Sequence, residues 1–260
     1  MDLQLKNKVI VATGGANGIG AAIVREAANE HARPVIVDRD ASAAEALVAE
    51  LQRAGMESYQ IACDLSRAEN CAAVVKETLA HFGQLDALVN CAGINDRIGL
   101  ENGSPEAYVQ SLERNLLYYY NLAHYALPAL KQSRGSIINI ASKTAVTGQG
   151  GTSGYASSKG AILALTREWA VELLPYGIRV NAIVPAEVMT PMYDRWLKTF
   201  PHPEEKRSHI LSKIPLGKRM TTPEEIAATV LFVISPRAGH IHGQHLFVDG
   251  GYVHLDRALT

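Results

Sequence analysis

Residues 9–20 read VIVATGGANGIG, and this stretch decides the fold. A short apolar run leads directly into a glycine-rich turn, and a helical pattern follows the turn. Free backbone N–H groups and the positive dipole end of a helix at such a turn suit a pyrophosphate. Glycine is needed because a Cβ would block the approach of the phosphates or the packing of the helix on the strand. The stretch predicts a dinucleotide-binding unit, and a tight glycine-rich loop without a ligand is the alternative interpretation.

Short apolar runs alternate with longer stretches of helical period along the whole chain. This alternation is typical of a parallel sheet with crossover helices on its faces. We predict seven strands, at residues 9–13, 34–38, 58–63, 87–90, 136–140, 179–183 and 245–248. The predicted fold class is α/β, with a single Rossmann-like doubly wound domain over residues 1–260 and a seven-stranded parallel sheet covered by helices on both faces.

Several local patterns mark where helices begin. Three residue pairs fit capping boxes and two prolines fit first helical turns, namely Ser42 with Glu45, Ser66 with Glu69, Thr222 with Glu225, Pro105 and Pro223. Residues 108–130 and 154–174 each read as one long helical segment. Residues 186–217 contain four prolines and are too irregular for a core helix, so we predict that they form a mobile substrate lid.

Composition and charge narrow the class of protein. Of the 260 residues, 47% are hydrophobic and 20% are charged, which allows a sizeable core. The 25 basic and 26 acidic residues give a net charge of −1, so we expect no nucleic-acid partner. Cys63, Cys71 and Cys91 are odd in number and lack metal-ligand spacing, which favours a reducing, cytoplasmic location. Residues 1–8 lack the apolar region of a signal peptide and no run of 18 apolar residues follows, so we expect no membrane association.

Asp38 ends the second predicted strand, where a ribose-binding carboxylate should lie relative to the glycine turn. Its charge would accept hydrogen bonds from the ribose hydroxyls and repel a 2′-phosphate, so NAD is the preferred cofactor. Arg39 is adjacent, and its guanidinium could reach a 2′-phosphate. Use of NADP therefore stays open, as does a surface arginine without a role.

Four polar residues form a candidate catalytic set. Tyr155 and Lys159 are four residues apart, so both side chains lie on one face of a helix. Ser142 follows an apolar strand, and Asn115 lies inside a helical segment, where a polar amide is locally unfavourable. Removal of hydride from an alcohol requires a base for the hydroxyl proton, with Ser142 stabilising the oxyanion. Lys159 and the positive ring of the cofactor are expected to lower the pKa of Tyr155 by about 2 to 3 units so that it can be this base.

These residues resemble motifs of the short-chain dehydrogenase/reductase family, in which three residues separate the first two key glycines. The pair Asp64-Leu65 is similar to the family's adenine-flanking pair, and residues 90–93 match its N-N-A-G element with Cys91 replacing the second asparagine. Residues 185–190 read PAEVMT and resemble its P-G-x-V-x-T element, with Ala186 replacing glycine.

The resemblance implies roles for individual residues. The catalytic tetrad would be Asn115, Ser142, Tyr155 and Lys159, with Asn115 holding a water that links Lys159 to solvent. The cofactor would be bound by Gly14, Asn17, Gly18, Ile19, Asp38, Arg39, Asp64, Leu65, Asn90, Ala92, Gly93, Tyr155, Lys159, Pro185, Glu187, Val188 and Thr190.

Side chains expected around the substrate are mostly polar, namely Asn95, Lys143, Gln149, Thr152 and Glu187, with Trp196 supplying an aromatic face. Such a set suits a sugar. A solvent-facing glutamate is the alternative interpretation of Glu187. Residues 95–100, 143–155, 185–191 and 246–259 are similar to those of bacterial L-fucose dehydrogenases within the family. This resemblance implies NAD(P)-dependent oxidation of an aldose at the anomeric carbon to a sugar lactone.

Other interpretations stay open. A 3-oxoacyl or other ketone reductase of the same fold is one alternative function, and a non-catalytic dinucleotide-sensing protein is another. We expect no metal at His240, His242 and His245, because no carboxylate or cysteine completes a site, and we expect Tyr118, Tyr119 and Tyr120 to pack in a core or between subunits. Residues 249–259 resemble family elements at a subunit interface, which implies a homotetramer whose C-terminal tail reaches a neighbouring pocket.

Overall fold

A parallel seven-stranded sheet forms the centre of the protein, in a computed structural model that describes residues 1–256. Its strands are β1 (Val9–Thr13), β2 (Arg33–Asp38), β3 (Tyr59–Ala62), β4 (Ala87–Asn90), β5 (Ser136–Ile140), β6 (Arg179–Pro185) and β7 (His245–Val248). They lie in the order β3-β2-β1-β4-β5-β6-β7, and all neighbouring pairs are parallel. The predicted fold class and all seven strands are confirmed, with three strands differing from their predicted bounds by one or two residues.

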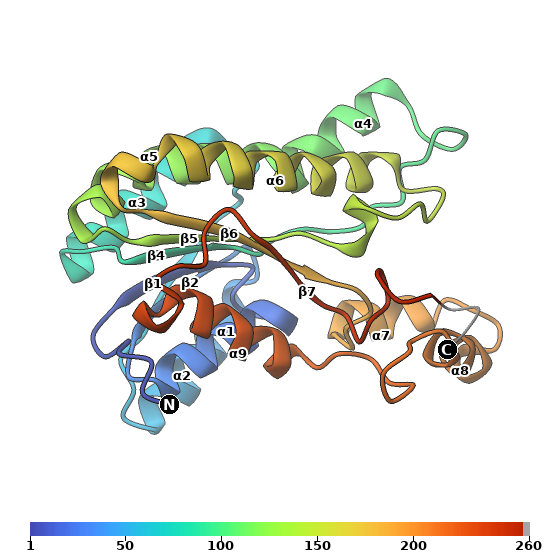
Figure 1. Cartoon of the computed structure of the whole chain (residues 1–260), viewed down its shortest axis with the longest axis horizontal. Coiled ribbons are helices and arrows are strands. Elements are labelled where there is room, and N and C mark those ends of the chain that lie inside the picture. Colours follow the sequence, from blue (N-terminus) through green and yellow to red (C-terminus); the bar gives the residue numbers. More distant parts are fainter. Residues whose placement is uncertain (257–260) are drawn as a thin grey trace.

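Helices cover both faces of the sheet (Figure 1). The helices α1 (Gly18–Asn29), α2 (Ala41–Arg53) and α9 (Pro223–Ile234) cover one face. The other face is covered by α3 (Ala68–Phe82), α5 (Tyr118–Ser133) and α6 (Ser153–Glu172). Successive strand residues enter opposite cores, with Val9 and Val11 on the α5 side and Ile10 and Ala12 on the α1 side. Because each strand is buried on both faces, it reads as a continuous apolar run.

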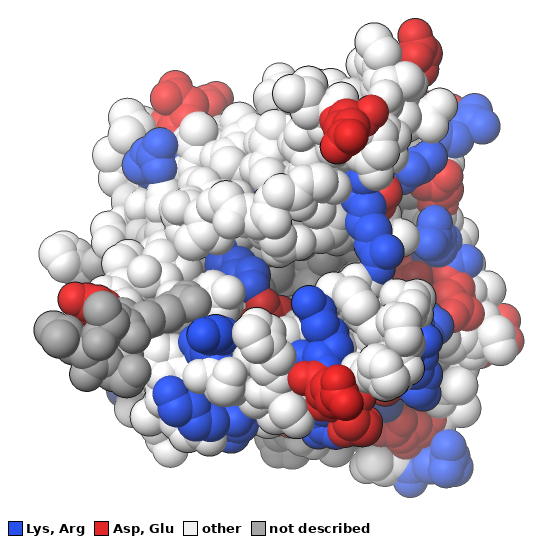
Figure 2. Space-filling model, turned by 90° about the vertical axis from the view of Figure 1, so that its right-hand side faces the viewer, with Lys and Arg blue, Asp and Glu red and all other residues white. Residues whose placement is uncertain are grey.

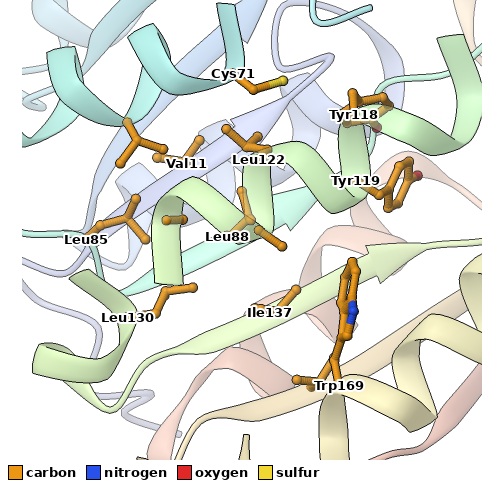
Figure 3. Close-up of a cluster of buried hydrophobic side chains, with 14 of the residues drawn as sticks. Val11, Cys71, Leu85, Leu88, Tyr118, Tyr119, Leu122, Leu130, Ile137 and Trp169 are labelled. Carbon is orange, nitrogen blue, oxygen red and sulfur yellow. The ribbon is translucent and has the colours of Figure 1, made fainter. Parts of the chain in front are cut away.

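The core on the α5 side carries side chains from all three of its covering helices (Figure 3). Leu122 of α5 and Trp169 of α6 lie over the strands, and Cys71 enters from α3. Tyr118 and Tyr119 are fully buried in this core, as predicted, whereas Tyr120 is 55% exposed. The core therefore fixes the start of α5 and with it the hydroxyl groups of the two buried tyrosines.

Two of the three predicted capping boxes are wrong. Thr222 and Glu225 do form one at the start of α9. Helix α2, however, begins at Ala41 behind Asp40, whose carboxylate accepts from the N–H of Ala43. Helix α3 begins at Ala68, and the N–H of Ser66 donates instead to Asp64. Asp40 therefore caps α2 two residues before the predicted serine, whereas α3 begins after Arg67 without a side-chain cap.

The segment over residues 108–130 is not one regular helix. It consists of α4 (Pro105–Leu112), a π-helical turn over Glu113–Leu117 and α5. Asn115 lies in the π-helical turn. Single π-helical turns are rare in proteins, but those that occur often lie at functional sites. The polar amide that is unfavourable in a regular helix therefore lies in an irregular turn of this kind.

Residues 186–217 form two short helices, α7 (Pro191–Leu197) and α8 (Pro203–Ser212), where the sequence predicted an irregular segment. Pro191 and Pro203 each occupy a first helical turn, where proline is tolerated, and they begin helices instead of breaking them. Both helices lie together at one end of the molecule, beyond the strands (Figure 1). That this segment moves as a lid stays a prediction. Among residues 1–256, no helix combines the length and apolar character needed to cross a bilayer.

Candidate active site

The turn between β1 and α1 forms a cradle of backbone donors. Gly14 has a φ of +62°, and a Cβ there would lie 3.0 Å from the Cα of Ala92. A Cβ on Gly20 would overlap the carbonyl oxygen of Gly14. Asn17 precedes α1 without a side-chain cap bond, so the N–H groups of the first turn, that of Ile19 included, have no side-chain acceptor there. N–H groups without a side-chain acceptor at the start of a helix, beside glycines that leave room for a ligand, fit the pyrophosphate of a dinucleotide.

Asp38 lies beside this cradle. Its Oδ2 accepts a hydrogen bond from the N–H of Ala16 at 3.1 Å, and its Oδ1 accepts from the N–H of Asp40 at 3.0 Å. Asp38 is the last residue of β2, which pairs with β1, and Arg39 follows it on the surface. The carboxylate and the guanidinium therefore stand at the edge of the cradle, where a ribose and its substituents would lie.

Asp64 and Leu65 follow β3, but only one of them is exposed. Asp64 accepts a hydrogen bond from the N–H of Ser66 at 3.0 Å, and this bond holds the pKa of Asp64 below its ordinary value. The Leu65 side chain is buried in the core beneath α3. Of this pair, Asp64 therefore offers the larger surface to a ligand.

The loop after β4 is anchored by residues that the sequence analysis missed. Thr13 Oγ1 accepts from the N–H groups of Cys91 and Ala92 at 2.8 and 3.1 Å. The Tyr118 hydroxyl donates to the carbonyl oxygen of Ala92 at 2.6 Å. A hydroxyl at the end of the apolar strand β1 was the available signal for Thr13, whereas nothing in the local sequence points from Tyr118 to this loop.

Asn90 precedes the same loop and is fully buried. Its amide donates to Asn139 Oδ1 at 3.0 Å, which links β4 to β5. A side chain without exposed surface does not contact a ligand, so Asn90 supports the cofactor region from within the sheet. That Asn90 contributes to cofactor binding stays a prediction.

Ser142, Tyr155 and Lys159 come together at the carboxyl end of β5. Ser142 lies close enough to Tyr155 to lower the pKa of the phenol, and Lys159 Nζ lies 5.6 Å from the centroid of the Tyr155 ring. Lys159 is buried and donates to the carbonyl oxygen of Ile140 at 2.8 Å and to the Tyr119 hydroxyl at 3.0 Å. The helical spacing of Tyr155 and Lys159 thus places both beside Ser142, and Tyr119 is a further member that sequence reasoning missed.

Asn115 reaches this group through the loop after β4. Its Oδ1 accepts from the N–H of Ile94 at 2.8 Å, and its Nδ2 donates to the carbonyl oxygen of Ser111 at 3.0 Å. A Cβ on Gly93 would lie 3.1 Å from Asn115 Oδ1 and 3.6 Å from Lys159 Nζ. Asn115 and Lys159 therefore flank Gly93, and a Cβ at this position would be tight against Asn115.

The protonation of the two central groups differs from the expectation. Burial raises the pKa of Tyr155 to about 12, and the nearby Ser142 opposes this shift. Burial also lowers the pKa of Lys159 to about 8. The predicted lowering of the Tyr155 pKa is absent from the protein without a cofactor, because burial raises this pKa, and Lys159 donates its hydrogen bonds to Ile140 and Tyr119. A positive charge bound beside Tyr155 would favour the phenolate.

Lys143 and Glu187 form an ion pair next to this centre. Their side chains are only 11% and 12% exposed, which contradicts the solvent-facing interpretation of Glu187. Lys143 directly follows Ser142, and Glu187 follows β6. Figure 2 looks onto this end of the molecule and shows a hollow with acidic and basic side chains around it. The predicted polar character of the substrate region is thus present as a partly desolvated ion pair.

The other predicted substrate residues are spread over different environments. Trp196 packs edge-on against Tyr193 and Phe200, with ring centroids 5.0 Å apart in each case. Asn95 Oδ1 accepts from a backbone N–H in its own loop. Gln149 is exposed and Thr152 is buried. The structure therefore brings Lys143 and Glu187 together as an ion pair. That the remaining four residues contact the substrate stays a prediction.

The segment over residues 185–190 runs from β6 to the glycine cradle. Pro185 is the last residue of β6, and Val188 pairs with Thr221. Thr190 caps α7, and a Cβ on Gly18 would lie 3.2 Å from Thr190 Cγ2. This contact places Val188 and Thr190 on the side of the cradle that faces the catalytic group.

The histidines near β7 have structural partners. His242 Nδ1 accepts from the N–H of Val180, and His245 Nε2 lies 3.0 Å from the carbonyl oxygen of Leu163. Within residues 1–256 no group of three or more His, Cys, Asp and Glu side chains could hold a metal ion.

Comparison with known proteins identifies the family. The profile described as enoyl-(acyl carrier protein) reductase matches residues 14–253, which include the glycine cradle, Ser142, Tyr155 and Lys159. The chain belongs to the short-chain dehydrogenase/reductase family. It is therefore an oxidoreductase of a family that uses NAD or NADP, and the resemblance of its motifs is confirmed.

Relatives within the family differ in their reactions. The chain is 37% identical to an L-fucose dehydrogenase from Bos taurus over 96% of this chain and 91% of the relative. It is 33% identical to the 3-oxoacyl-acyl-carrier-protein reductase FabG from Thermotoga maritima, over 96% of this chain and all of that one. Among solved structures, Cj0485 dehydrogenase is 48% identical, with a TM-score of 0.94 over 100% of this chain and 99% of that one.

One departure from the family's N-N-A-G element concerns the thiol of Cys91. Burial raises the pKa of Cys91 to about 12, so the thiol stays neutral near Lys159. It therefore adds no charge beside the lysine of this short-chain dehydrogenase/reductase.

Proposed function

We propose that the protein oxidises an aldose, with L-fucose as the first candidate, at the anomeric carbon to the sugar lactone. The observation that carries this proposal is the nearly desolvated Lys143–Glu187 ion pair near Ser142 and Tyr155. A steroid or an acyl chain would leave the remaining donors of Lys143 and acceptors of Glu187 unused, whereas a polyhydroxylated substrate supplies partners for them. The names of several relatives, L-fucose dehydrogenase among them, support the same substrate class.

The residues of this chain would divide the reaction between them. Tyr155, as phenolate, takes the proton from the anomeric hydroxyl, and Ser142 donates a hydrogen bond to the same oxygen. Lys159 holds positive charge near Tyr155 and reaches Asn115 across Gly93 for proton release. A bound nicotinamide ring supplies the acceptor for the hydride and a second positive charge.

We propose NAD as the preferred cofactor, because the Asp38 carboxylate stands at the edge of the cradle and would repel a 2′-phosphate. Arg39 leaves use of NADP possible. The cradle at Gly14 and Gly20 and the bare first turn of α1 fit the pyrophosphate of either one.

A ketone reductase is the second candidate, and the FabG relative favours it. The two functions differ in what the pocket must accept, because an acyl thioester brings an apolar chain toward Lys143 and Glu187. A dinucleotide-sensing protein without catalysis is the third possibility, although the assembled Ser142, Tyr155 and Lys159 would then have no use. We also propose a cytoplasmic homotetramer that acts on a small molecule, with neither nucleic acid nor membrane as a partner.

A substrate panel with one variant tests the proposed function. Reduction of NAD and of NADP is measured with L-fucose, D-arabinose, L-galactose, aliphatic alcohols and, in reverse, acetoacetyl thioesters, and the product is identified as lactone or ketone. We expect turnover with aldoses, a lactone product and a preference for NAD. Tyr155→Phe should lose turnover by at least about 1,000-fold while it binds NAD as the wild type does, because only the proton acceptor is removed. Turnover of the thioesters without turnover of any aldose would replace this proposal by the second candidate.

A further inference from the structure

Three loops that follow neighbouring strands meet beside Ser142. Strands β5, β6 and β7 are adjacent and parallel, so their carboxyl ends lie at one edge of the sheet. Lys143 follows β5, Glu187 follows β6 and Tyr252 follows β7. Sequence separation hides this proximity, since Lys143 and Tyr252 lie more than a hundred residues apart.

The side chains of these loops form one connected cluster. Lys143 is paired with Glu187, and its Nζ lies 4.1 Å from the centroid of the Tyr252 ring. Glu187 also lies close enough to Tyr193 of α7 to raise the pKa of that phenol. The Tyr252 ring therefore lies beside Lys143 of its own chain. That the tail beginning at this residue reaches a neighbouring subunit stays a prediction. Residues 257–259 of that predicted tail lie outside the described residues.

Stability alone is a weak explanation for this ion pair. Both side chains are nearly removed from water, and the desolvation of two charges can exceed their attraction. Two apolar side chains would join the loops after β5 and β6 at no such cost. Charges kept in the hollow next to a reaction centre point to a ligand that uses them.

The hydrogen-bonding capacity of the pair matches two adjacent hydroxyl groups. An ammonium has three donors and no acceptor, and a carboxylate has about four acceptor sites and no donor. A hydroxyl can accept from Lys143 while its neighbour on the next carbon donates to Glu187. The Tyr252 ring, held over Lys143, offers an apolar wall for the carbon face between them. Trp196 is instead packed on Tyr193 and Phe200.

We propose that Lys143, Glu187, Tyr193 and Tyr252 form one specificity subsite that recognises a vicinal diol of the substrate. Lys143 and Glu187 bind the two hydroxyls, Tyr193 orients the carboxylate, and Tyr252 replaces Trp196 as the aromatic wall. The inference rests on the proposed function, because it assumes a polyhydroxylated substrate whose reacting carbon lies at Tyr155.

The test compares L-fucose with its monodeoxy analogues, each of which lacks one ring hydroxyl, in the wild type and in Lys143→Met. For wild type we expect kcat/KM to fall about 10- to 100-fold with the analogues that lack a recognised hydroxyl. Lys143→Met should lower kcat/KM for L-fucose by a similar factor, mainly through KM, but lower that of the same analogue less than threefold. Equal losses for L-fucose and for every analogue would overturn the proposal.

Substitution of Tyr252 gives a second, independent test that does not remove a buried charge. Tyr252→Leu should raise KM for L-fucose about tenfold, and Tyr252→Phe should restore it, because the ring and not the hydroxyl forms the wall. The matched control is Tyr176→Leu, since Lys131 Nζ lies 3.7 Å from the Tyr176 ring centroid away from the site. Lys8→Met is the control for the ion pair, because Lys8 pairs with Asp86 at the amino ends of β1 and β4, away from the site.

The outcomes separate the two levels of the proposal. Wild-type enzyme that oxidises no aldose contradicts the proposed function and this subsite with it. Wild-type enzyme that oxidises L-fucose, with Tyr252→Leu unchanged in KM or Lys143→Met equally impaired on all sugars, supports the function and overturns the subsite.

Discussion

At the scale of single residues, Lys159 combines two demands that oppose each other. Its ammonium must lie close to Tyr155, yet burial lowers its pKa from the ordinary 10.5 to about 8. Two acceptors, the carbonyl oxygen of Ile140 and the Tyr119 hydroxyl, offset part of the cost of burying the charge. The position is therefore tuned for reactivity near neutral pH at the expense of folding stability.

Replacement of Lys159 should make the protein more stable and inactive. Below pH 8 lysine is protonated in both the folded and the unfolded state, and the full cost of burial applies; it corresponds to about 3 kcal/mol. Between pH 8 and 10.5 the unfolded state binds more protons, so the stability contributed by Lys159 rises with pH. With about 1 kcal/mol subtracted for each lost hydrogen bond, Lys159→Met should raise the free energy of unfolding at pH 7 by about 1 kcal/mol.

Urea denaturation at pH 7 and pH 10 measures this effect. The advantage of Lys159→Met should shrink or reverse at pH 10, whereas Lys198→Met, whose side chain is 70% exposed, should show no such pH dependence. If Lys159→Met were less stable than wild type by the same amount at both pH values, burial would not lower the pKa of Lys159.

At the scale of elements, the glycines of the turn between β1 and α1 serve both the packing of α1 and the binding of the cofactor. The close approach of Gly20 to Gly14 sets the angle at which α1 leaves the sheet. The same angle directs the N–H groups of the first turn into the cradle. Packing of α1 against α9 and β2 then depends on the glycines that serve the ligand.

Gly20→Ala should therefore damage stability and binding together. Because a Cβ at residue 20 would overlap backbone, we expect a loss of about 2 to 4 kcal/mol in the free energy of unfolding and a loss of NAD binding. Gly160→Ala in α6 is the matched control. Its nearest neighbour, the carbonyl oxygen of Ala145, would lie 3.9 Å away, so it should gain about 0.5 to 1 kcal/mol. Denaturation and NAD titration of both variants test this prediction. Equal free energies of unfolding and equal NAD affinities for the two variants would contradict it.

At the scale of the whole molecule, a mostly apolar groove lies on the outer surface of α5 and α6. It is lined by Leu116, Leu117, Tyr120, Ala161, Ala164 and Leu165, with Glu168 as a charged side chain beside them. Leu117 and Tyr120 are exposed there although both are large and apolar. Contiguous apolar surface of this kind marks protein interaction sites, and we propose that it is covered by another copy of the chain.

A charge in this groove should weaken assembly. Tyr120→Glu should reduce the molar mass measured by light scattering after gel filtration, because a carboxylate would be buried in an apolar contact. Tyr120→Phe keeps the ring and should assemble as wild type does. A single mass for all three proteins, whether monomer or tetramer, would show that this surface is not the interface.

The parts of this protein that sequence alone determined are those that depend on neighbours along the chain. The apolar strands, the glycine turn, Asp38 at the end of β2 and the spacing of Tyr155 and Lys159 were all predictable, since periodicity and turn chemistry act over a few residues. Even so, two predicted caps were wrong, because more than one acceptor lies near each helix start: Asp40 caps α2, and Asp64 accepts from the N–H of Ser66 before α3.

Contacts between loops were decided only in three dimensions. The order of β5, β6 and β7 brings Lys143, Glu187 and Tyr252 together, and the order of β1 and β4 places Thr13 under the loop at Cys91. The raised pKa of Tyr155 and the lowered pKa of Lys159 arise from burial by every element around them. Desolvation is a property of the packed molecule, so no local pattern of residues contains it.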